Sequence, residues 1–214
     1  MTVRQQWAVV LAVVGVLGLG LWTATRVLSD EIFPVTIGTK APAFVATAVD
    51  GSGRTRSLAD FRDSVVLLNV WATWCLPCRE EMPSIQALHE RYGGRGLKVV
   101  AVSVDDPGAE AAIRDFVREY GLTFEILHEP TGAIQRAYQT TGVPETFVIG
   151  RDGIIQRKEN GHRDWNSPAN RALIARLIGV PADTAAPAAP AAPGAGADAP
   201  AARAVPAAPA GGAR

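Results

Sequence analysis

The sequence predicts an α/β domain, built on a mixed sheet with helices on both faces, that follows one transmembrane helix. Two short apolar runs, Val65–Val70 and Leu97–Val104, have the composition of strands buried on both faces. Amphipathic stretches alternate with these runs, which is the pattern of parallel strands joined by helices. Near the N-terminus, the uncharged segment Gln5–Thr25 is long enough to cross the roughly 30 Å hydrocarbon core of a bilayer.

The first half of the domain alternates strands with helices. Phe44–Val49 and Thr55–Leu58 flank an Asp-Gly turn, which is typical of a β-hairpin. After the first buried run, the segment Glu80–Tyr92 repeats apolar residues at helical spacing. The second buried run leads into another helix, Ala109–Tyr120, which also has one apolar face.

The second half of the domain ends in antiparallel strands and a closing helix. Phe124–Leu127 is a short strand, and Ile134–Tyr138 is a short helix. Thr146–Ile149 and Ile154–Lys158 flank the turn RDG and form a second hairpin. Pro168–Ile178 is amphipathic and closes the domain. We expect the connections between parallel strands to be right-handed.

Both ends of the chain differ from this domain. We expect residues 1–30 to form a membrane anchor, 35–180 the globular domain and 181–214 a disordered tail, because Ala, Pro and Gly dominate the last segment. Trp7 and Trp22 lie near the ends of the apolar run, where aromatic rings favour the membrane interface. A cleaved signal peptide is the alternative, although its apolar region is usually only about 7–15 residues long. A short N-terminal tail favours a cytoplasmic N-terminus, which would place the domain outside.

The charge composition argues against a nucleic-acid-binding protein. The chain has 21 Lys and Arg residues against 21 Asp and Glu residues, and these charges are mixed rather than gathered into a basic stripe. Its two cysteines are too few for a disulfide-rich scaffold. A hydrophobic core must therefore hold the fold together.

Cys75 and Cys78 could form a metal site, a structural disulfide, a pair of inert core thiols or a redox centre. A structural zinc needs about four ligands, and the three histidines, His89, His128 and His162, show no paired spacing. A disulfide across two intervening residues closes a very small loop and constrains the unfolded chain little. Buried cysteines are common, so inert thiols stay an alternative.

The position of the cysteines favours redox chemistry. The buried run ends at Val70, the loop WATW follows, and a helix is expected to begin near Cys75. Free N–H groups and the helix dipole stabilise an anion at a helix N-terminus, so the pKa of Cys75 should fall below its usual value. Cys78 lies one turn farther in, and Pro77 suits the first turn. We expect an exposed attacking thiolate with a buried resolving thiol beside it.

The motifs around the cysteines resemble those of the thioredoxin fold. WCLPC follows VVLLNVWAT, and GVPETFVIGRDG comes later in the chain. APAFVATAVDG, SLADFR, AVSVDD and GHRDWNSP extend the likeness, over about residues 38–178, to the membrane-anchored TlpA/ResA/CcmG group of thiol–disulfide oxidoreductases. GHRDWNSP is closer to the TlpA branch, and Pro-Glu-Thr at 144–146 is closer to the CcmG branch. The resemblance implies a thioredoxin fold with an N-terminal β-hairpin and an inserted αβ unit.

The resemblance also assigns roles to single residues. Pro144 matches the family's cis-proline, beside which Val143 would offer its backbone to a partner's extended segment. Glu81 matches a glutamate near the resolving thiol, and a partly buried carboxylate one turn from Cys78 could exchange protons with it. Asn69 stands where ordinary thioredoxins carry a buried aspartate, and it cannot accept a proton at neutral pH. Each residue also has a purely structural alternative. Pro144 could simply start a strand, Glu81 could be a solvated carboxylate, and Asn69 could be a hydrogen-bonded polar residue at the end of a strand.

Aromatic, acidic and histidine side chains around the motif have further expected places. We expect Trp74 to shield the nucleophile and offer a docking surface, and Trp71 to belong to the core. Glu145 would approach the active face, where it repels a thiolate or selects a basic partner, unless it is a solvent-facing strand residue. His128 and His162 are expected at the surface or in packing.

The expected function is reduction of disulfides in partner proteins at the outer surface of a membrane. The resemblance implies a single-pass protein of the bacterial inner membrane with a periplasmic catalytic domain, no cofactor, no metal and no nucleic-acid partner. Its expected partners are haem-binding CxxC motifs of apocytochrome c or copper-site cysteines of respiratory proteins, and its electron donor is a membrane dithiol protein. A compartment that oxidises thiols gives such a reductant a reason to exist.

Two other functions share part of this pattern. Peroxiredoxins share the fold and the APAF-type opening, but their Pro and Thr, seven and three residues before the cysteine, are Leu68 and Ala72 here. A copper chaperone would combine both cysteines with a remote histidine such as His162, because thiolates suit Cu(I). Those chaperones usually have three residues between the cysteines, whereas this chain has two.

Overall fold

The computed structural model describes residues 2–32 and 34–181 of the 214-residue chain. These residues form an N-terminal helix and a domain with a seven-stranded sheet. The tail expected over 181–214 lies outside the described residues apart from its first position.

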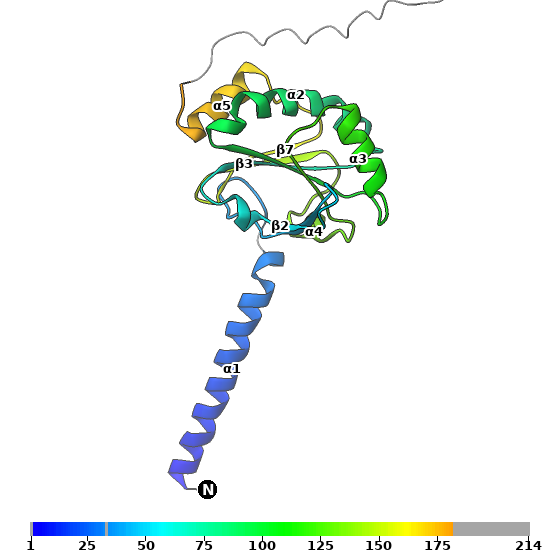
Figure 1. Cartoon of the computed structure of the whole chain (residues 1–214). Coiled ribbons are helices and arrows are strands. Elements are labelled where there is room, and N and C mark those ends of the chain that lie inside the picture. Colours follow the sequence, from blue (N-terminus) through cyan, green and yellow to red (C-terminus); the bar gives the residue numbers. More distant parts are fainter. Residues whose placement is uncertain (1, 33, 182–214) are drawn as a thin grey trace, which may run out of the picture. The chain divides into compact units, whose positions relative to one another are not determined.

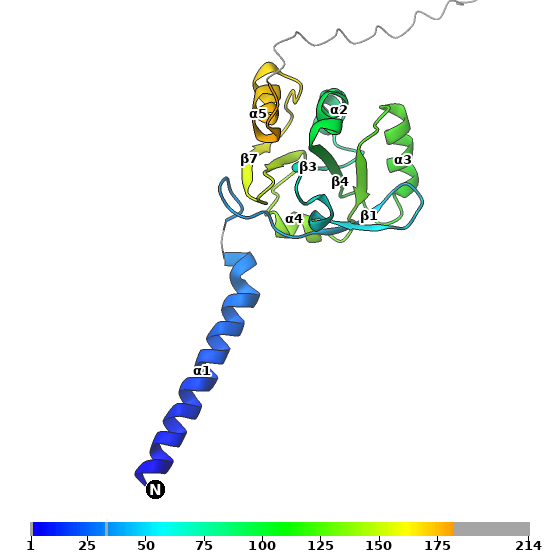
Figure 2. The same cartoon turned by 60° about the vertical axis from the view of Figure 1, so that its left-hand side comes forward.

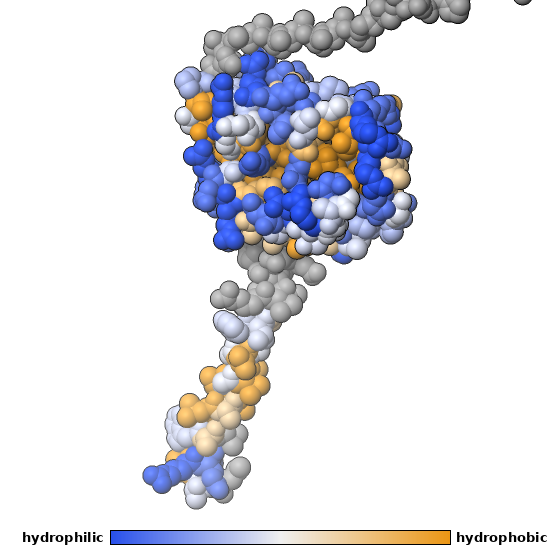
Figure 3. Space-filling view, viewed as in Figure 1, coloured by the Kyte–Doolittle hydropathy of each residue, from blue (hydrophilic) through white to orange (hydrophobic). Residues whose placement is uncertain are grey.

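Helix α1 (Val3–Ile32) contains the apolar segment that the sequence predicts to cross a membrane. Within it, the 22 residues Val3–Ala24 are apolar enough for a bilayer, and none of that segment is buried. At 1.5 Å per residue they extend about 33 Å, close to the thickness of a hydrocarbon core. Hydrophilic side chains gather at the N-terminal end of α1 and apolar ones along its middle (Figure 3). A signal sequence has the same properties, so α1 supports either an anchor or a signal.

The domain is built on a mixed sheet with strand order β2-β1-β5-β4-β3-β6-β7 (Figures 1 and 2). Strand β3 is parallel to β4, and β4 is parallel to β5. On one side β6 and β7 continue the sheet antiparallel, and on the other β1 and β2 do so. The strands are β1 (Val45–Ala48), β2 (Thr55–Ser57), β3 (Val65–Trp71), β4 (Leu97–Ser103), β5 (Glu125–His128), β6 (Glu145–Ile149) and β7 (Ile155–Asn160).

Helices and two short 3-10 turns connect the strands. The hairpin of β1 and β2 turns at Gly51, whose φ of 83° suits glycine. The helical elements of the domain are η1 (Leu58–Phe61), α2 (Leu76–Tyr92), η2 (Gly93–Arg95), α3 (Glu110–Glu119), α4 (Ala133–Ala137) and α5 (Pro168–Ile178).

One hydrophobic core lies between the sheet and helices α2, α3 and α5. Alternate residues of β3, including Leu67 and Trp71, enter this core and are fully buried. The rings of Trp71 and Phe116 on α3 are 4.6 Å apart, and Met82 of α2 and Ile174 of α5 join the same cluster. This face of the sheet therefore carries the helix that begins at the cysteines.

A second core lies on the opposite face of the sheet. The other residues of β3, including Leu68 and Val70, pack here with Phe147 of β6 and Tyr138, which follows α4. Val35, three residues after α1, is buried in the same cluster. Strand β3 is buried on both faces, and this is why its sequence is an almost continuous apolar run.

The structure confirms the expected order of strands and helices. Helix α2 begins at Leu76, which confirms the start expected near Cys75, whereas apolar spacing alone marks the helix only from Glu80. Apolar periodicity is weak in its first turn because that turn is occupied by the CxxC motif instead of core residues. The helix therefore begins directly at the motif, as expected from the position of Cys75.

Candidate active site

The two cysteines form a disulfide at the N-terminus of α2. The Cα atoms of Cys75 and Cys78 are 5.2 Å apart and the sulfurs are joined. Cys75 is the N-cap of the helix, and its Sγ accepts a hydrogen bond of 3.2 Å from the backbone N–H of Cys78. Pro77 lies in the first turn, where no intrahelical N–H is needed. The sulfur of Cys75 thus lies where helix N–H groups favour a negative charge.

The disulfide is less exposed than the sequence suggested. Cys75 is 4% exposed and Cys78 is fully buried. The expectation of an exposed Cys75 is wrong for this oxidised form, because Cys75 packs with the core under α2. Its neighbours Trp74 and Leu76 are instead 70% and 66% exposed, so an apolar surface flanks Cys75 on both sides in the sequence.

The loop before the disulfide is held by Asp105, which follows strand β4. Both carboxylate oxygens of Asp105 accept from the backbone N–H of Thr73, at 3.0 and 3.2 Å. The hydroxyls of Thr73 and Ser103 donate to the same carboxylate at 2.7 and 2.6 Å. Asp105 is 3% exposed, so these contacts fix the loop against β4 in a water-poor setting.

Arg79 ties the first turn of α2 to α3. Its Nε donates to the hydroxyl of Tyr120 at 3.1 Å, and Nη2 is 3.2 Å from Oε1 of Glu119. The guanidinium also lies 5.3 Å from the ring centroid of Phe116. The CxxC turn is therefore supported from β4 on one side and from α3 on the other.

Glu81 lies one helical turn after Cys78 and is fully buried. Nδ2 of Asn69 donates to its Oε1 at 2.7 Å, and also to Oγ1 of Thr146 at 2.9 Å. Burial raises the pKa of Glu81 to about 7, although the hydrogen bonds it accepts act in the opposite direction. The structure thus brings together Asn69 of β3, Glu81 of α2 and Thr146 of β6.

The loop between β7 and α5 covers Glu81. The backbone N–H of Arg163 faces Oε2 of Glu81 at 3.4 Å. Ser84, one turn farther along α2, accepts from the backbone N–H of Trp165 at 3.0 Å. Trp165 itself is fully buried in the core beside α5. This loop is the GHRDW segment, and its backbone is fastened to α2 around the buried carboxyl.

The segment before β6 contains a cis peptide bond between Val143 and Pro144. Pro144 is buried, and its carbonyl accepts from the N–H of Gly161 at 2.8 Å. Glu145 pairs with Val70 in the sheet, so Pro144 follows this register next to the end of β3. Val143 is half-buried and packs against both cores.

Glu145 lies neither on the exposed active face nor on a solvent-facing side of its strand, the two places expected from the sequence. It is 1% exposed and points, like Phe147, into the core on the face opposite Glu81. Nζ of Lys158 lies 3.1 Å from its Oε1, and neither carboxylate oxygen meets the geometry of a hydrogen bond within the described residues. The expectation was wrong because the alternation of β6 sends this side chain inward, where Lys158 supplies a counter-charge.

The remaining candidates have mainly structural places. Trp71 is fully buried, as expected. His128 is buried and its Nε2 lies 2.9 Å from the carbonyl of Asp105, whereas His162 is exposed. Among residues 2–32 and 34–181, no group of three or more His, Cys, Asp or Glu side chains is arranged to hold a metal ion.

Comparisons with known proteins agree with this geometry. Residues 37–158 match the model of the AhpC/TSA family. The thiol-disulfide oxidoreductase ResA of Bacillus thuringiensis subsp. konkukian is 31% identical over 155 residues, or 72% of this chain and 86% of the relative. The thioredoxin-like protein YneN of Bacillus subtilis is 34% identical over 153 residues, or 71% and 88%.

A solved structure from Chlorobium tepidum, provisionally named thiol:disulfide interchange protein DsbE, is similar in fold and in sequence. It has a TM-score of 0.60 and 30% identity, and the match covers 67% of this chain and 99% of that one. The chain belongs to the AhpC/TSA family. It has the thioredoxin fold and is a thiol–disulfide oxidoreductase of the ResA and DsbE type, as the CxxC context predicted.

In this AhpC/TSA family chain, packing residues occupy the two positions where peroxiredoxins carry the Pro and Thr of their peroxidatic motif. Leu68 and Ala72, seven and three residues before Cys75, are both fully buried. Neither can donate a hydrogen bond from its side chain to a peroxide. The relatives named above are oxidoreductases or thioredoxin-like proteins.

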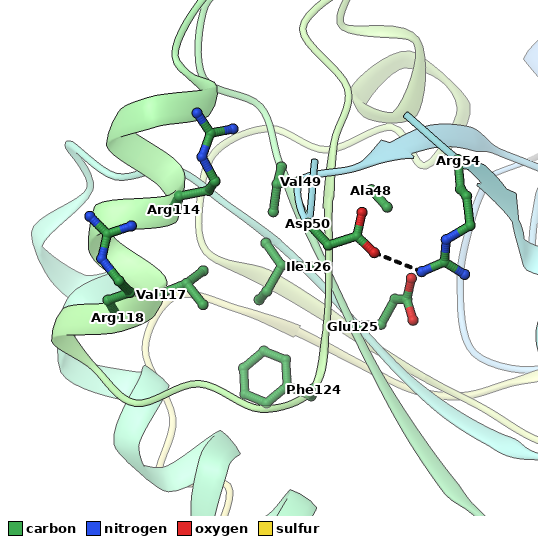
Figure 4. A pocket seen from close by; sticks show the side chains of 10 residues that line it. All are labelled: Ala48, Val49, Asp50, Arg54, Arg114, Val117, Arg118, Phe124, Glu125 and Ile126. Carbon is green, nitrogen blue, oxygen red and sulfur yellow. Dashed lines mark hydrogen bonds and ion pairs between the residues drawn. The ribbon is translucent and has the colours of Figure 1, made fainter. Parts of the chain in front are cut away.

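The AhpC/TSA domain also has a pocket of about 290 Å³ that is separate from the disulfide site (Figure 4). Its apolar floor includes Val117, Phe124 and Ile126. On its rim Arg54 is paired with Asp50 at 2.8 Å. None of the lining residues belongs to the disulfide site.

Sequence reasoning missed several residues that build the site. Asp105 could have been found, because it follows a buried parallel strand whose carboxyl end lies at the same edge as the CxxC loop. Thr146 and the loop around Trp165 gave no signal of contact with Glu81, since they lie more than 60 residues away in sequence. Only the fold brings them to α2.

Proposed function

We propose that this oxidoreductase is tethered to the bacterial inner membrane and reduces disulfides of partner proteins on the outer side. Residues 1–30 serve as the anchor, 35–180 as the catalytic domain and 181–214 as a tail. The apolar α1 supports the anchor, and the likeness to the ResA and DsbE proteins supports the activity. The observation that carries the proposal is a disulfide at the N-cap of α2 beside an exposed apolar surface.

The reaction begins with the reduced protein. The thiolate of Cys75, stabilised at the helix N-terminus, attacks one sulfur of a partner disulfide. A bond forms between Cys75 and that sulfur, the partner disulfide breaks, and the second partner sulfur leaves as a thiolate. Trp74 and Leu76 supply the apolar surface on which the partner docks, and Val143 beside Pro144 offers its backbone to an extended segment.

The second step releases the partner. Cys78 gives its proton to the carboxylate of Glu81, so the S–H bond breaks and an O–H bond forms. The Cys78 thiolate then attacks Cys75, and the remaining partner sulfur leaves as a thiolate. Two electrons have passed to the partner, and the protein is left with the disulfide that this structure shows. A carboxyl with a pKa of about 7 suits this role, since it can both accept and release a proton near neutral pH.

The partners follow from the compartment and the family. Haem-binding CxxC pairs of apocytochrome c and cysteines of respiratory copper sites must be kept reduced where thiols are otherwise oxidised. The electrons are resupplied by a membrane dithiol protein. No small-molecule cofactor is needed, because thiol–disulfide exchange moves the electrons directly.

Trapping with Cys78→Ser tests this proposal. In cells, Cys75 of this variant should accumulate mixed disulfides with partner proteins, because the resolving thiol is missing. The adducts should be released by dithiothreitol and identified by mass spectrometry. A variant with both cysteines replaced is the control and should hold no partner. Absence of reducible adducts in the single variant would refute the mechanism, and adducts without haem-binding or copper-site proteins would refute the assigned partners.

A further inference from the structure

Strand β5 ends in His128, whose ring is buried against the connection between β4 and α3. Only 4% of the residue is exposed. Nε2 lies 2.9 Å from the backbone carbonyl oxygen of Asp105. Nδ1 lies 3.4 Å from Oε1 of Glu110, and the two groups form an ion pair when the ring is protonated. The ring therefore links Asp105, near the start of this connection, to Glu110, the first residue of α3.

The contact with Asp105 shows which ring nitrogen carries a hydrogen. A carbonyl oxygen can only accept a hydrogen bond, so Nε2 of His128 must be the donor. Asp105 is 3% exposed, and a buried carbonyl that loses its donor is costly. His128 therefore fixes the direction of this peptide group, and with it the backbone from which the carboxylate of Asp105 extends.

The carboxylate of Asp105 supports the loop that leads into the CxxC motif. It accepts from the N–H and the hydroxyl of Thr73, at 3.0 and 2.7 Å. Two residues later, Sγ of Cys75 accepts from the N–H of Cys78 at 3.2 Å, as the N-cap of α2. A displacement of Thr73 would move this sulfur away from the helix N-terminus, where a thiolate is stabilised. A continuous series of contacts thus runs from His128 to Cys75.

We infer that His128 is a positioning residue for Cys75. By donating to the carbonyl of Asp105, it holds the carboxylate of that residue against Thr73. The loop then keeps the sulfur of Cys75 at the N-cap of α2, where its thiolate is stabilised. The inference rests on the proposed role of Cys75 as the nucleophile, and it adds a residue that acts on the sulfur through Asp105 and Thr73.

The pH profile of Cys75 alkylation in the reduced full chain tests this role. The protein is kept in detergent micelles, iodoacetamide is the reagent, and mass spectrometry assigns the modified cysteine. A Gln side chain can place its amide nitrogen where Nε2 of His128 lies, whereas Asn can place its nitrogen where Nδ1 lies. Both variants lose the ring, but only His128→Gln keeps a donor for the carbonyl of Asp105. The midpoint should move to higher pH in His128→Asn and stay close to the wild type in His128→Gln.

Glu110→Gln separates positioning from a direct effect of charge. The side chain of Glu110 is 48% exposed, so this substitution does not disturb the core. Removal of a negative charge alone would favour the thiolate and move the midpoint of Cys75 to lower pH. Loss of the charge that orients the ring of His128 should instead move the midpoint to higher pH, by less than in His128→Asn. If His128→Asn does not fold, the direction of this shift decides.

His89→Leu is the matched control for the loss of a histidine. His89 is half-buried near the C-terminal end of α2, and its ring lies 5.8 Å from that of Phe124. This variant should be less stable but should keep the wild-type midpoint. A shift as large as that of His128→Asn would show that general loosening, and not positioning, controls the sulfur.

Two further results distinguish the inference from the proposed reaction. If His128→Asn had the wild-type midpoint, or if Glu110→Gln moved the midpoint to lower pH, the positioning role would be wrong and the cysteine reactions would be unaffected. If Cys75 of the wild type were not the faster-reacting cysteine, the proposed nucleophile would be wrong, and the role of His128 would be wrong with it.

Discussion

Glu81 and Glu145 are both buried carboxylates, but they lie on opposite faces of the sheet and are balanced in different ways. Glu145 faces the ammonium group of Lys158. Glu81 has neutral donors only, and burial raises its pKa to about 7. A buried acid without a counter-charge binds its proton more tightly in the folded protein than in the unfolded chain. This difference separates a group suited to proton exchange from one suited to structure.

The raised pKa of Glu81 predicts a pH-dependent stability. Its folded pKa of about 7 exceeds the ordinary value of 4.5, so its contribution is fully present below pH 4.5 and is lost as the pH rises through 7. The wild type should lose about 3 kcal/mol of unfolding free energy over this range, and Glu81→Gln should not. Urea denaturation of both oxidised proteins at several pH values measures the difference. If the free energy of unfolding changed equally with pH in the two proteins, the raised pKa would not belong to Glu81.

The ion pair of Glu145 predicts a stability effect that does not depend on redox chemistry. Lys158→Met leaves a buried carboxylate without its counter-charge and should lower the free energy of unfolding by about 3 kcal/mol. Replacing only one partner of a buried ion pair costs far more than replacing both partners by apolar residues. The double variant Lys158→Met with Glu145→Leu should recover most of that loss. Denaturant midpoints of the single and double variants measure this. Equal losses in both would show that Glu145 is not balanced by Lys158.

Single residues show where the sequence was sufficient and where it was not. Cys75 and Cys78 could be assigned because a local pattern places them at a helix N-terminus. The inward direction of the Glu145 side chain was not predicted. It depends on which face of the sheet each residue of β6 takes, and that is set by pairing with β3 and β7 directly after the cis bond at Pro144. Its alternation with Phe147 was the one available signal.

At the scale of elements, the loop between β3 and α2 depends on Asp105 beyond β4. Asp105→Ala should remove the partners of Thr73 N–H and of two hydroxyls, at a cost of about 2–3 kcal/mol. Asp105→Asn retains an oxygen acceptor and should cost less. The reaction of Cys75 with a thiol reagent should also change, because the loop that presents it is loosened. Chemical denaturation and alkylation rates measure both effects, and unchanged values in the Ala variant would contradict this support.

The elements themselves were largely predictable because each has a short-range pattern. β3 and β4 are continuous apolar runs, and the hairpin of β1 and β2 has an Asp-Gly turn. Apolar spacing alone marks α2 only from Glu80, because its first turn holds the cysteines and not core residues, whereas the CxxC motif itself predicts the start near Cys75. The sites between elements, such as Asn69 with Glu81 and Thr146, depend on tertiary register and had no local signature.

At the scale of the whole molecule, helix α1 and the oxidoreductase domain have separate physical requirements. The domain buries its own two cores within the residues that follow α1. The apolar segment Val3–Ala24 is unburied and needs a nonpolar environment of its own. Val35 belongs to the second core, so few residues separate the end of α1 from the packed domain.

The proposed anchor predicts that the chain remains membrane-bound through α1, and the separate cores predict that the domain folds without it. The full-length protein should stay in the membrane fraction after washing at alkaline pH and should keep its original N-terminus. A variant that starts at Pro34 should be soluble, with the same far-ultraviolet circular dichroism per residue for the domain and the same rate of insulin disulfide reduction. A full-length protein that is found shortened and soluble would show that α1 is a signal sequence. An insoluble or inactive shorter variant would show that the domain needs α1 to fold.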